Sequence, residues 1–285
     1  MTTQSYQPGL SDKKKLEITS LAASALSGFF GTAGALFFNW MVQWWLGRDM
    51  KRANGLSLLA ISVTVAIGIV IRIFWPIQII RADWHKVQIL LIAVAFGVIG
   101  VIFGKLYEKR LKEAHLRQMF IGILLLTSFK LLGFIPAQLF SSLPVDARTA
   151  TALWSLVAGI GTPLLGAGGG FFLIPAFLGI GFSRDEAILM SLIVTGFLVL
   201  FGAWLFHRAG RLEIKDLRHV WLPATIGTPV GVWLSYQVSP EYFQSLFGIL
   251  LIIAAGKTLH DISTGFRQLI RGIFSFRTRR EHVVS

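Results

Sequence analysis

Cysteine is absent from this chain of 285 residues, and acidic residues are few. The absence of cysteine excludes disulfides, thiolate metal sites and thiol redox chemistry. Charged residues make up only 14% of the sequence, whereas typical soluble domains contain roughly 25%. Hydrophobic residues make up 54%. The composition therefore indicates that water is not the main solvent of this protein.

None of the 14 acidic residues falls in the middle of an apolar segment. The sequence therefore gives no support for a buried carboxylate that binds a proton or a sodium ion inside a membrane. It also contains no pairing of a nucleophile with a base, no H-E-x-x-H motif and no phosphate-binding loop. We expect neither an enzyme, nor a cofactor, nor a metal site.

Long charge-free apolar runs recur along the whole chain, and most are close to the ~20 residues that cross a bilayer as a helix. They are Ile18 to Gly47, Ala53 to Ile71, Val87 to Gly104, Thr149 to Ser183, Ala187 to Phe206 and Tyr242 to Gly256. The predicted fold is an all-α polytopic membrane protein with about eight hydrophobic segments. The net charge of +13 does not indicate nucleic acid, because the basic residues lie in short loops and tails, as the positive-inside rule describes.

The chain matches itself in two places. Residues 31–35, Gly-Thr-Ala-Gly-Ala, align with residues 166–170, Gly-Ala-Gly-Gly-Gly, and the match continues after a one-residue gap. Farther along, Gly100 and Gly104 align with Gly227 and Gly231 at one constant offset, which extends to Lys130 and Lys257. The sequence therefore predicts two related halves, each with one glycine-interrupted segment followed by three more apolar segments.

The first segment of each half is too long for one crossing. The runs of 30 and 35 residues would be about 45 and 52 Å long as straight helices, against a hydrocarbon core of ~30 Å. Glycine lowers helix stability by about 1 kcal/mol per residue, and the glycine clusters are central. Each segment is therefore either one over-long crossing or two half-helices that enter the membrane and return to the same side.

Loop charges favour the returning half-helices. With a cytoplasmic N-terminus, this arrangement places 21 Lys and Arg inside and 4 outside, whereas single crossings would place 16 inside and 9 outside. The first distribution fits the positive-inside rule better. Each half then has an odd number of full crossings, so the second half is inverted relative to the first, as in many transporters. Both glycine breaks would meet near the bilayer midplane, and both termini would be cytoplasmic.

These assignments divide the single membrane domain along the sequence. A mobile N-terminal tail covers residues 1–12, and the first repeat covers 13–134. An external linker follows at 135–148, and the second repeat covers 149–262. Residues 263–285 form a basic tail in which Phe266, Leu269, Ile270, Ile273 and Phe274 follow a helical stripe. This stripe predicts an interfacial helix that binds anionic lipid of the cytoplasmic leaflet.

The glycine breaks are the predicted binding site. A half-helix beginning at Gly169 or Gly170 would direct free N–H groups and its positive end toward a cavity, which is how helices bind small anions. Irregular backbone at membrane depth is tolerated only where protein or such a cavity satisfies it. The candidate site residues are Gly168, Gly169, Gly170, Thr162, Ser191 and Thr195 in the second half, and Gly31, Thr32, Gly34, Asn39, Asn54 and Ser57 in the first.

Each candidate also has an interpretation without a ligand. The glycines can serve close helix packing, which is the main interpretation of Gly100, Gly104, Gly227 and Gly231. The Ser and Thr hydroxyls can bond carbonyls of their own helix.

Three further residues carry charge or titrate near an apolar span. Arg72 and Lys130 each lie toward the predicted outer end of their own apolar span, and we expect their long side chains to reach the membrane interface. A role in attracting anions stays open for both. His207, at the cytoplasmic end of its span, can titrate near neutrality but is expected to be structural.

The second half resembles the signature of the TauE/SafE sulfite exporter family, also called TSUP. The resemblance rests on residues 166–170 followed by Pro175, Gly181, Ala187 and Ser191, and on residues 210–212, 227–231 and 247–248. It implies a bacterial inner-membrane permease for sulfite or small organosulfur anions such as sulfonates, thiosulfate or sulfoacetate. The first half departs from the pattern, with Thr32, Ala33 and Ala35 in place of glycines and Trp40 in place of proline.

The leading hypothesis is a permease that moves such a sulfur anion by alternating access around the two breaks. A membrane sensor or scaffold with the same fold is the second hypothesis, and an intramembrane enzyme is the third. A homo-oligomer stays open, and membrane lipid is the other expected partner.

Overall fold

The computed structural model describes residues 10–31, 34–46, 50–74, 83–107, 146–166, 168–208 and 217–253, together with positions 118, 121–122, 125–126, 128–129, 132–134, 255–256 and 259–260. These residues form helices and turns, without a strand among them. The expected N-terminal tail up to residue 9, the linker at 135–145 and the C-terminal lipid-binding helix lie outside the described residues, as do Thr32 and Lys130.

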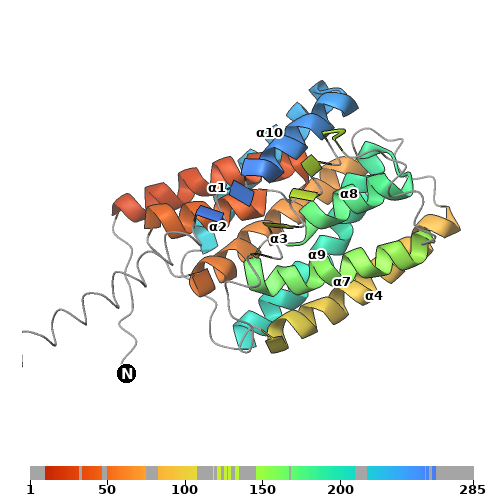
Figure 1. Cartoon of the computed structure of the whole chain (residues 1–285). Helices are drawn as coiled ribbons and strands as arrows, with labels where there is room; N and C mark the ends of the chain where they lie inside the picture. The colour runs from red at the N-terminus through yellow and green to blue at the C-terminus, as the bar shows by residue number, and fades with distance from the viewer. Residues whose placement is uncertain are drawn as a thin grey trace, which may run out of the picture. The chain divides into compact units, whose positions relative to one another are not determined.

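Eight helices are labelled in Figure 1. They are α1 (Leu10–Phe30), α2 (Gly34–Leu46), α3 (Met50–Phe74), α4 (Trp84–Tyr107), α7 (Ala147–Leu165), α8 (Gly170–Ile180), α9 (Arg184–Arg208) and α10 (Leu217–Gln237). A further apolar helix covers Pro240–Ile253. The chain forms two compact units, Met1–Arg110 with Leu143–Phe243 and Leu111–Ser142 with Gln244–Ser285. All eight labelled helices belong to the first unit, which therefore combines segments of both expected repeats.

The outer faces of several helices are apolar. Within the described residues, three helices are long and apolar enough to cross a membrane: Ala53–Phe74 in α3, Trp84–Tyr107 and Arg184–Arg208. Large apolar side chains remain exposed on α4, α9 and α10, among them Leu91, Leu106, Leu200, Leu222 and Trp233. Monomeric soluble proteins rarely expose so much contiguous apolar surface. The all-helical, membrane-embedded fold class is therefore confirmed.

Helices α1 and α10 cross closely and run in the same direction. Ser20 in the middle of α1 donates to the carbonyl of Val220 near the start of α10, at 2.5 Å. Farther along, a Cβ atom added to Gly231 would lie 1.9 Å from the carbonyl oxygen of Ala25, and one on Gly28 would lie 2.3 Å from that of Thr228. The absence of side chains at these glycines allows the two backbones to touch.

Helices α4 and α7 form the equivalent parallel pair and lie side by side in Figure 1. Cβ atoms added to Gly100 and Gly104 would lie 2.4 and 2.5 Å from the carbonyl oxygens of Leu156 and Ile160. A Cβ atom on Gly159 would lie 2.0 Å from that of Gly97. The predicted packing role of the paired glycines is therefore confirmed in both crossings.

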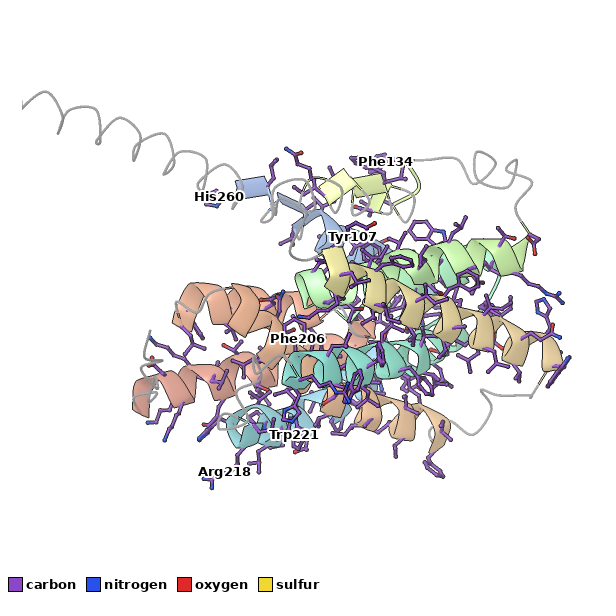
Figure 2. All side chains as sticks on the ribbon, turned by 90° about the horizontal axis from the view of Figure 1, so that it is seen from below. Tyr107, Phe134, Phe206, Arg218, Trp221 and His260 are labelled. Carbon is purple, nitrogen blue, oxygen red and sulfur yellow. The ribbon has the colours of Figure 1, made fainter. Side chains whose placement is uncertain are left out.

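Helices α3 and α9 pack against each other in opposite directions. The contacts run from Gly68 with Leu192 through Val65 with Gly196 to Leu58 with Gly202, so one residue number rises as the other falls. Phe206, near the end of α9, is fully buried and lies among the helices in Figure 2, whereas Arg218 projects from the start of α10. Both glycine breaks contact this pair of helices: Gly31 lies beside Ile188 of α9, and Gly166 lies beside Asn54 of α3.

Candidate functional site

The second glycine break is an abrupt turn between α7 and α8. Helix α7 ends at Leu165, and Gly166, with φ 63°, donates its N–H to the Thr162 carbonyl at 3.0 Å. Gly168 and Gly169 follow with φ of 67° and 76°, and α8 begins at Gly170. Left-handed backbone of this kind is strained for residues with a Cβ atom. The sequence of glycines is therefore required by the turn itself.

Space around the break is as restrictive as its dihedral angles. A Cβ atom on Gly168 would lie 3.1 Å from the Thr195 methyl carbon, and one on Gly169 would lie 3.1 Å from the Ala158 Cβ atom. Gly168, Gly169 and Gly170 are all buried. Since Gly169 is the N-cap of α8 and makes no side-chain cap, the positive end of α8 is buried at this point.

Polar side chains from the first half hold the free carbonyl groups at the end of α7. Asn54 donates from Nδ2 to the Leu164 carbonyl at 3.1 Å and more weakly to that of Pro163 at 3.4 Å. Ser57 donates to the Gly166 carbonyl at 2.6 Å. Asn39 donates from Nδ2 to Asn54 Oδ1 at 2.6 Å, and all three side chains are buried. These predicted site residues therefore do converge on one break, but on its carbonyl side.

The three hydroxyls of the second half differ in their bonding. Thr162 donates to the Ala158 carbonyl at 2.9 Å, and Ser191 donates to that of Ile188 at 2.7 Å. Both bonds stay within one helix, as the interpretation without a ligand predicts. Thr195 is fully buried, and its Oγ1 has no hydrogen-bond partner. Thr195, beside Gly168, is therefore the predicted hydroxyl with unused bonding capacity.

Gly31, at the first break, lies against apolar side chains. Gly31, with φ 68°, ends α1, and α2 begins at Gly34. A Cβ atom on Gly31 would lie 2.9 Å from Ile188 and 3.1 Å from Ile174. At the second break, the corresponding atom on Gly166 would lie 2.8 Å from Asn54 Oδ1 and 3.0 Å from Asn39 Nδ2. Ile174 and Ile188 thus lie beside Gly31 where Asn39 and Asn54 lie beside the equivalent Gly166.

The expectation that Arg72 extends to the interface is wrong. Its side chain has 0% exposure, and Nη2 donates to the Gly28 carbonyl at 2.9 Å and to Ser235 Oγ at 3.1 Å. The absent side chain of Gly28 leaves its carbonyl accessible near the end of α1, where a cation is favourable. Nε and Nη1 have no hydrogen-bond partner, and the guanidinium carbon lies 5.4 Å from the centre of the Tyr236 ring.

His207 is exposed near the end of α9. Separately, the sequence interpretation did not identify two buried hydroxyls. Ser27 on α1 and Ser155 on α7 are buried, and neither Oγ has a hydrogen-bond partner. The spacing of Ser20, Ser24 and Ser27 along one helix face was the available signal. In the part of the chain that the structure describes, no cluster of three or more His, Asp or Glu could hold a metal ion.

Comparison with known proteins gives one match. A model of the family described as Sulfite exporter TauE/SafE matches residues 4–131 and 151–281. No curated protein and no solved structure matches the chain. Since the family match extends over nearly the whole chain, the resemblance seen in the sequence is confirmed, and the chain belongs to the TauE/SafE sulfite exporter family of membrane transporters.

Proposed function

We propose that this protein is a permease that moves sulfite or a small organosulfur anion across the bacterial inner membrane by alternating access around the two glycine breaks. The observation that carries the proposal is the buried turn at residues 166–170, which directs the positive end of α8 into the protein beside the unpartnered hydroxyl of Thr195. A helix N-terminus binds anions through its free N–H groups and its dipole. A hydroxyl adds a hydrogen bond to an oxyanion.

Helix pairing supports an inverted repeat. In the proposed first repeat, α1 to α4 correspond to α7 to α10 of the second. The first helix of each repeat packs on the last of these four in the other, giving the parallel pairs α1 with α10 and α4 with α7. The equivalent helices α3 and α9 run antiparallel. An antiparallel relation between equivalent helices is expected for inverted repeats and not for repeats with the same orientation.

The contacts of each break support half-helices that return. Gly31 lies beside Ile188 near the start of α9, whereas Gly166 lies beside Asn54 near the start of α3. Because α3 and α9 are antiparallel, these positions are toward opposite ends of the pair. Helix α2 therefore has to run back from Gly31 toward the start of α3, and α8 back from Gly166 toward the start of α9. The proposed cytoplasmic location of both termini follows from the loop charges.

Two other functions would fit the same fold. A sensor or scaffold would bind the anion without moving it, and an enzyme would change it chemically without net movement. Purified protein in liposomes distinguishes the three, because sulfite, thiosulfate and sulfonates can be measured inside the vesicles and analysed for chemical change. Flux of an unaltered sulfur anion supports the permease, and the absence of flux for the whole panel would exclude it.

Substitution of Gly169 tests the break itself. Gly169→Leu should lower flux at least about tenfold, equivalent to ~1.4 kcal/mol, because the leucine would strain the turn and collide with Ala158. Gly181→Leu is the matched control, since Gly181 also has positive φ (103°) but open space around its Cβ position. Equal flux in the two variants would show that backbone strain alone accounts for the loss, and would contradict a specific role of the second break in transport.

A further inference from the structure

A small cavity lies between α1, α2 and α3, and Ile61 in its wall also lies beside Gly168, just before the start of α8. Its volume is about 10 Å³, which is room for roughly one water molecule. Four hydroxyl groups line it, from Ser20, Ser24 and Ser27 on α1 and Thr64 on α3, together with Phe38 and Ile61. The three serines lie on one face of α1. Their stripe extends from the middle of α1 to four residues before Gly31.

One of these hydroxyls has no partner. Ser24 donates to the Leu21 carbonyl and Thr64 to the Ala60 carbonyl, each at 3.0 Å. Ser27 is only 3% exposed, and its Oγ has no hydrogen-bond partner. A buried hydroxyl without a partner is unfavourable and calls for an explanation, such as a ligand that is bound in another state.

The second half also carries buried hydroxyls without partners, although not at the position equivalent to Ser27. Ser155 and Thr162 on α7 follow Ser20 and Ser27 by the offset that separates Gly166 from Gly31, and Thr195 on α9 corresponds to Ile61 on α3. Ser155 and Thr195 are fully buried without hydrogen-bond partners. Among the described side chains, the buried hydroxyls without a hydrogen-bond partner thus lie on α1 and α7, which end at the two breaks, and on α9, which contacts them.

We propose that the serine stripe of α1 lines the route by which a sulfur oxyanion travels between the cytoplasmic face and the first break, and that the cavity is the closed form of this route. The proposal rests on the proposed function. Hydroxyls donate hydrogen bonds to oxyanions, and none of the cavity-lining side chains is acidic. Lys13, Lys14 and Lys15 outnumber Asp12 and Glu17 at the start of α1, and this net positive charge attracts an anion to the mouth of the route. Ser155 on α7 lines the opposite, outer route.

Single cysteines test the route directly, because the chain has no cysteine of its own. Ser27→Cys and Ser155→Cys are treated with 2-sulfonatoethyl methanethiosulfonate, itself a sulfonate, and with its trimethylammonium analogue, in inside-out and right-side-out vesicles. Each rate is normalised to the rate of the same reagent with a free thiol. Thr225→Cys is the control for labelling outside the route, since Thr225 is exposed on the apolar outer face of α10 and its hydroxyl bonds the Leu222 carbonyl.

The sulfonate should modify Ser27→Cys faster than the cation by about tenfold or more, and only from the cytoplasmic side. Ser155→Cys should show the same preference from the outer side, and Thr225→Cys should show none. Absence of modification at Ser27→Cys, or equal rates for both charges, would overturn the proposal, and equal rates would identify a water site.

Filling the cavity provides a second measurement that separates this proposal from the permease function. Ser27→Leu should lower flux at least about tenfold, whereas Ser27→Ala, which adds no volume, should retain more of it. Normal flux in Ser27→Leu, with an unreactive Ser27→Cys, would refute the route and leave the permease standing. Anion-selective labelling without flux of any sulfur anion would refute the permease and leave an anion-accessible cavity.

Discussion

At the scale of single residues, the polar groups around the breaks divide into those that hold the backbone and those with bonding capacity to spare. Asn39, Asn54 and Ser57 belong to the first class, because their hydrogen bonds connect α2 and α3 to the end of α7. Thr195 belongs to the second. Stability and transport should therefore respond differently to substitution in the two classes.

Thr195→Val should separate stability from transport. The change keeps the shape of the side chain and removes a buried hydroxyl that has no partner, so the free energy of unfolding should stay the same or rise by up to about 1 kcal/mol. Flux should nevertheless fall. Thr228→Val is the control, since the Thr228 hydroxyl bonds the Ala224 carbonyl at 2.8 Å. Thermal unfolding in detergent and liposome flux provide the two readouts, and unchanged flux in Thr195→Val would remove this residue from the site.

The two asparagines should be strongly coupled. Asn54→Leu removes the hydrogen bond from Asn39 and the bonds to the Leu164 and Pro163 carbonyls, which should lower the free energy of unfolding by about 2–4 kcal/mol. The double variant Asn39→Leu with Asn54→Leu imitates the isoleucine pair beside Gly31 and should lose less than the sum of the single variants. A double-variant cycle by thermal unfolding measures this coupling. Additive losses would show that the two side chains act independently.

At the scale of elements, paired glycines determine how closely the helices cross. The contacts of Gly227 and Gly231 with Leu21 and Ala25 on α1 are repeated by those of Gly100 and Gly104 with α7. Alignment of the two halves identified these glycines but not their partners. Equivalent residues of α4 and α10 are 127 positions apart in the sequence, whereas equivalent residues of α1 and α7 are 135 apart. No single alignment therefore pairs the glycines with the helix that each contacts, and this pairing is seen only in the packing.

Gly231→Ala should separate α1 from α10. The added methyl group would lie 1.9 Å from the Ala25 carbonyl oxygen, and backbone cannot yield as a flexible side chain does, so the free energy of unfolding should fall by about 3 kcal/mol. Gly122→Ala is the control, because Gly122 is helical with open space around it and alanine favours the helix. Thermal unfolding that is equal for both variants would contradict the close crossing.

At the scale of the whole molecule, the central prediction is an inverted topology. Cysteine at Ala114, in the most basic loop, should react with an impermeant thiol reagent only from the cytoplasmic side. Cysteine at Ser142, in the linker between the halves, should react only from the outside. Both follow from the loop charges and are measured in oriented vesicles. Labelling of Ala114→Cys from the outside would restore the alternative in which each broken segment crosses once.

The amino-acid sequence by itself determined the membrane-embedded helical class, the positions of both glycine clusters and the family, because apolar length and positive-φ glycines act locally and leave a direct signature. Only the tertiary structure decided which groups are satisfied. Arg72 is buried rather than interfacial because Gly28 and Ser235, distant in sequence, supply acceptors. Asn54 caps a helix of the other half, whereas Thr195, Ser27 and Ser155 find no partner. Hydrogen-bond satisfaction depends on neighbours brought together by helix packing, which local periodicity does not encode.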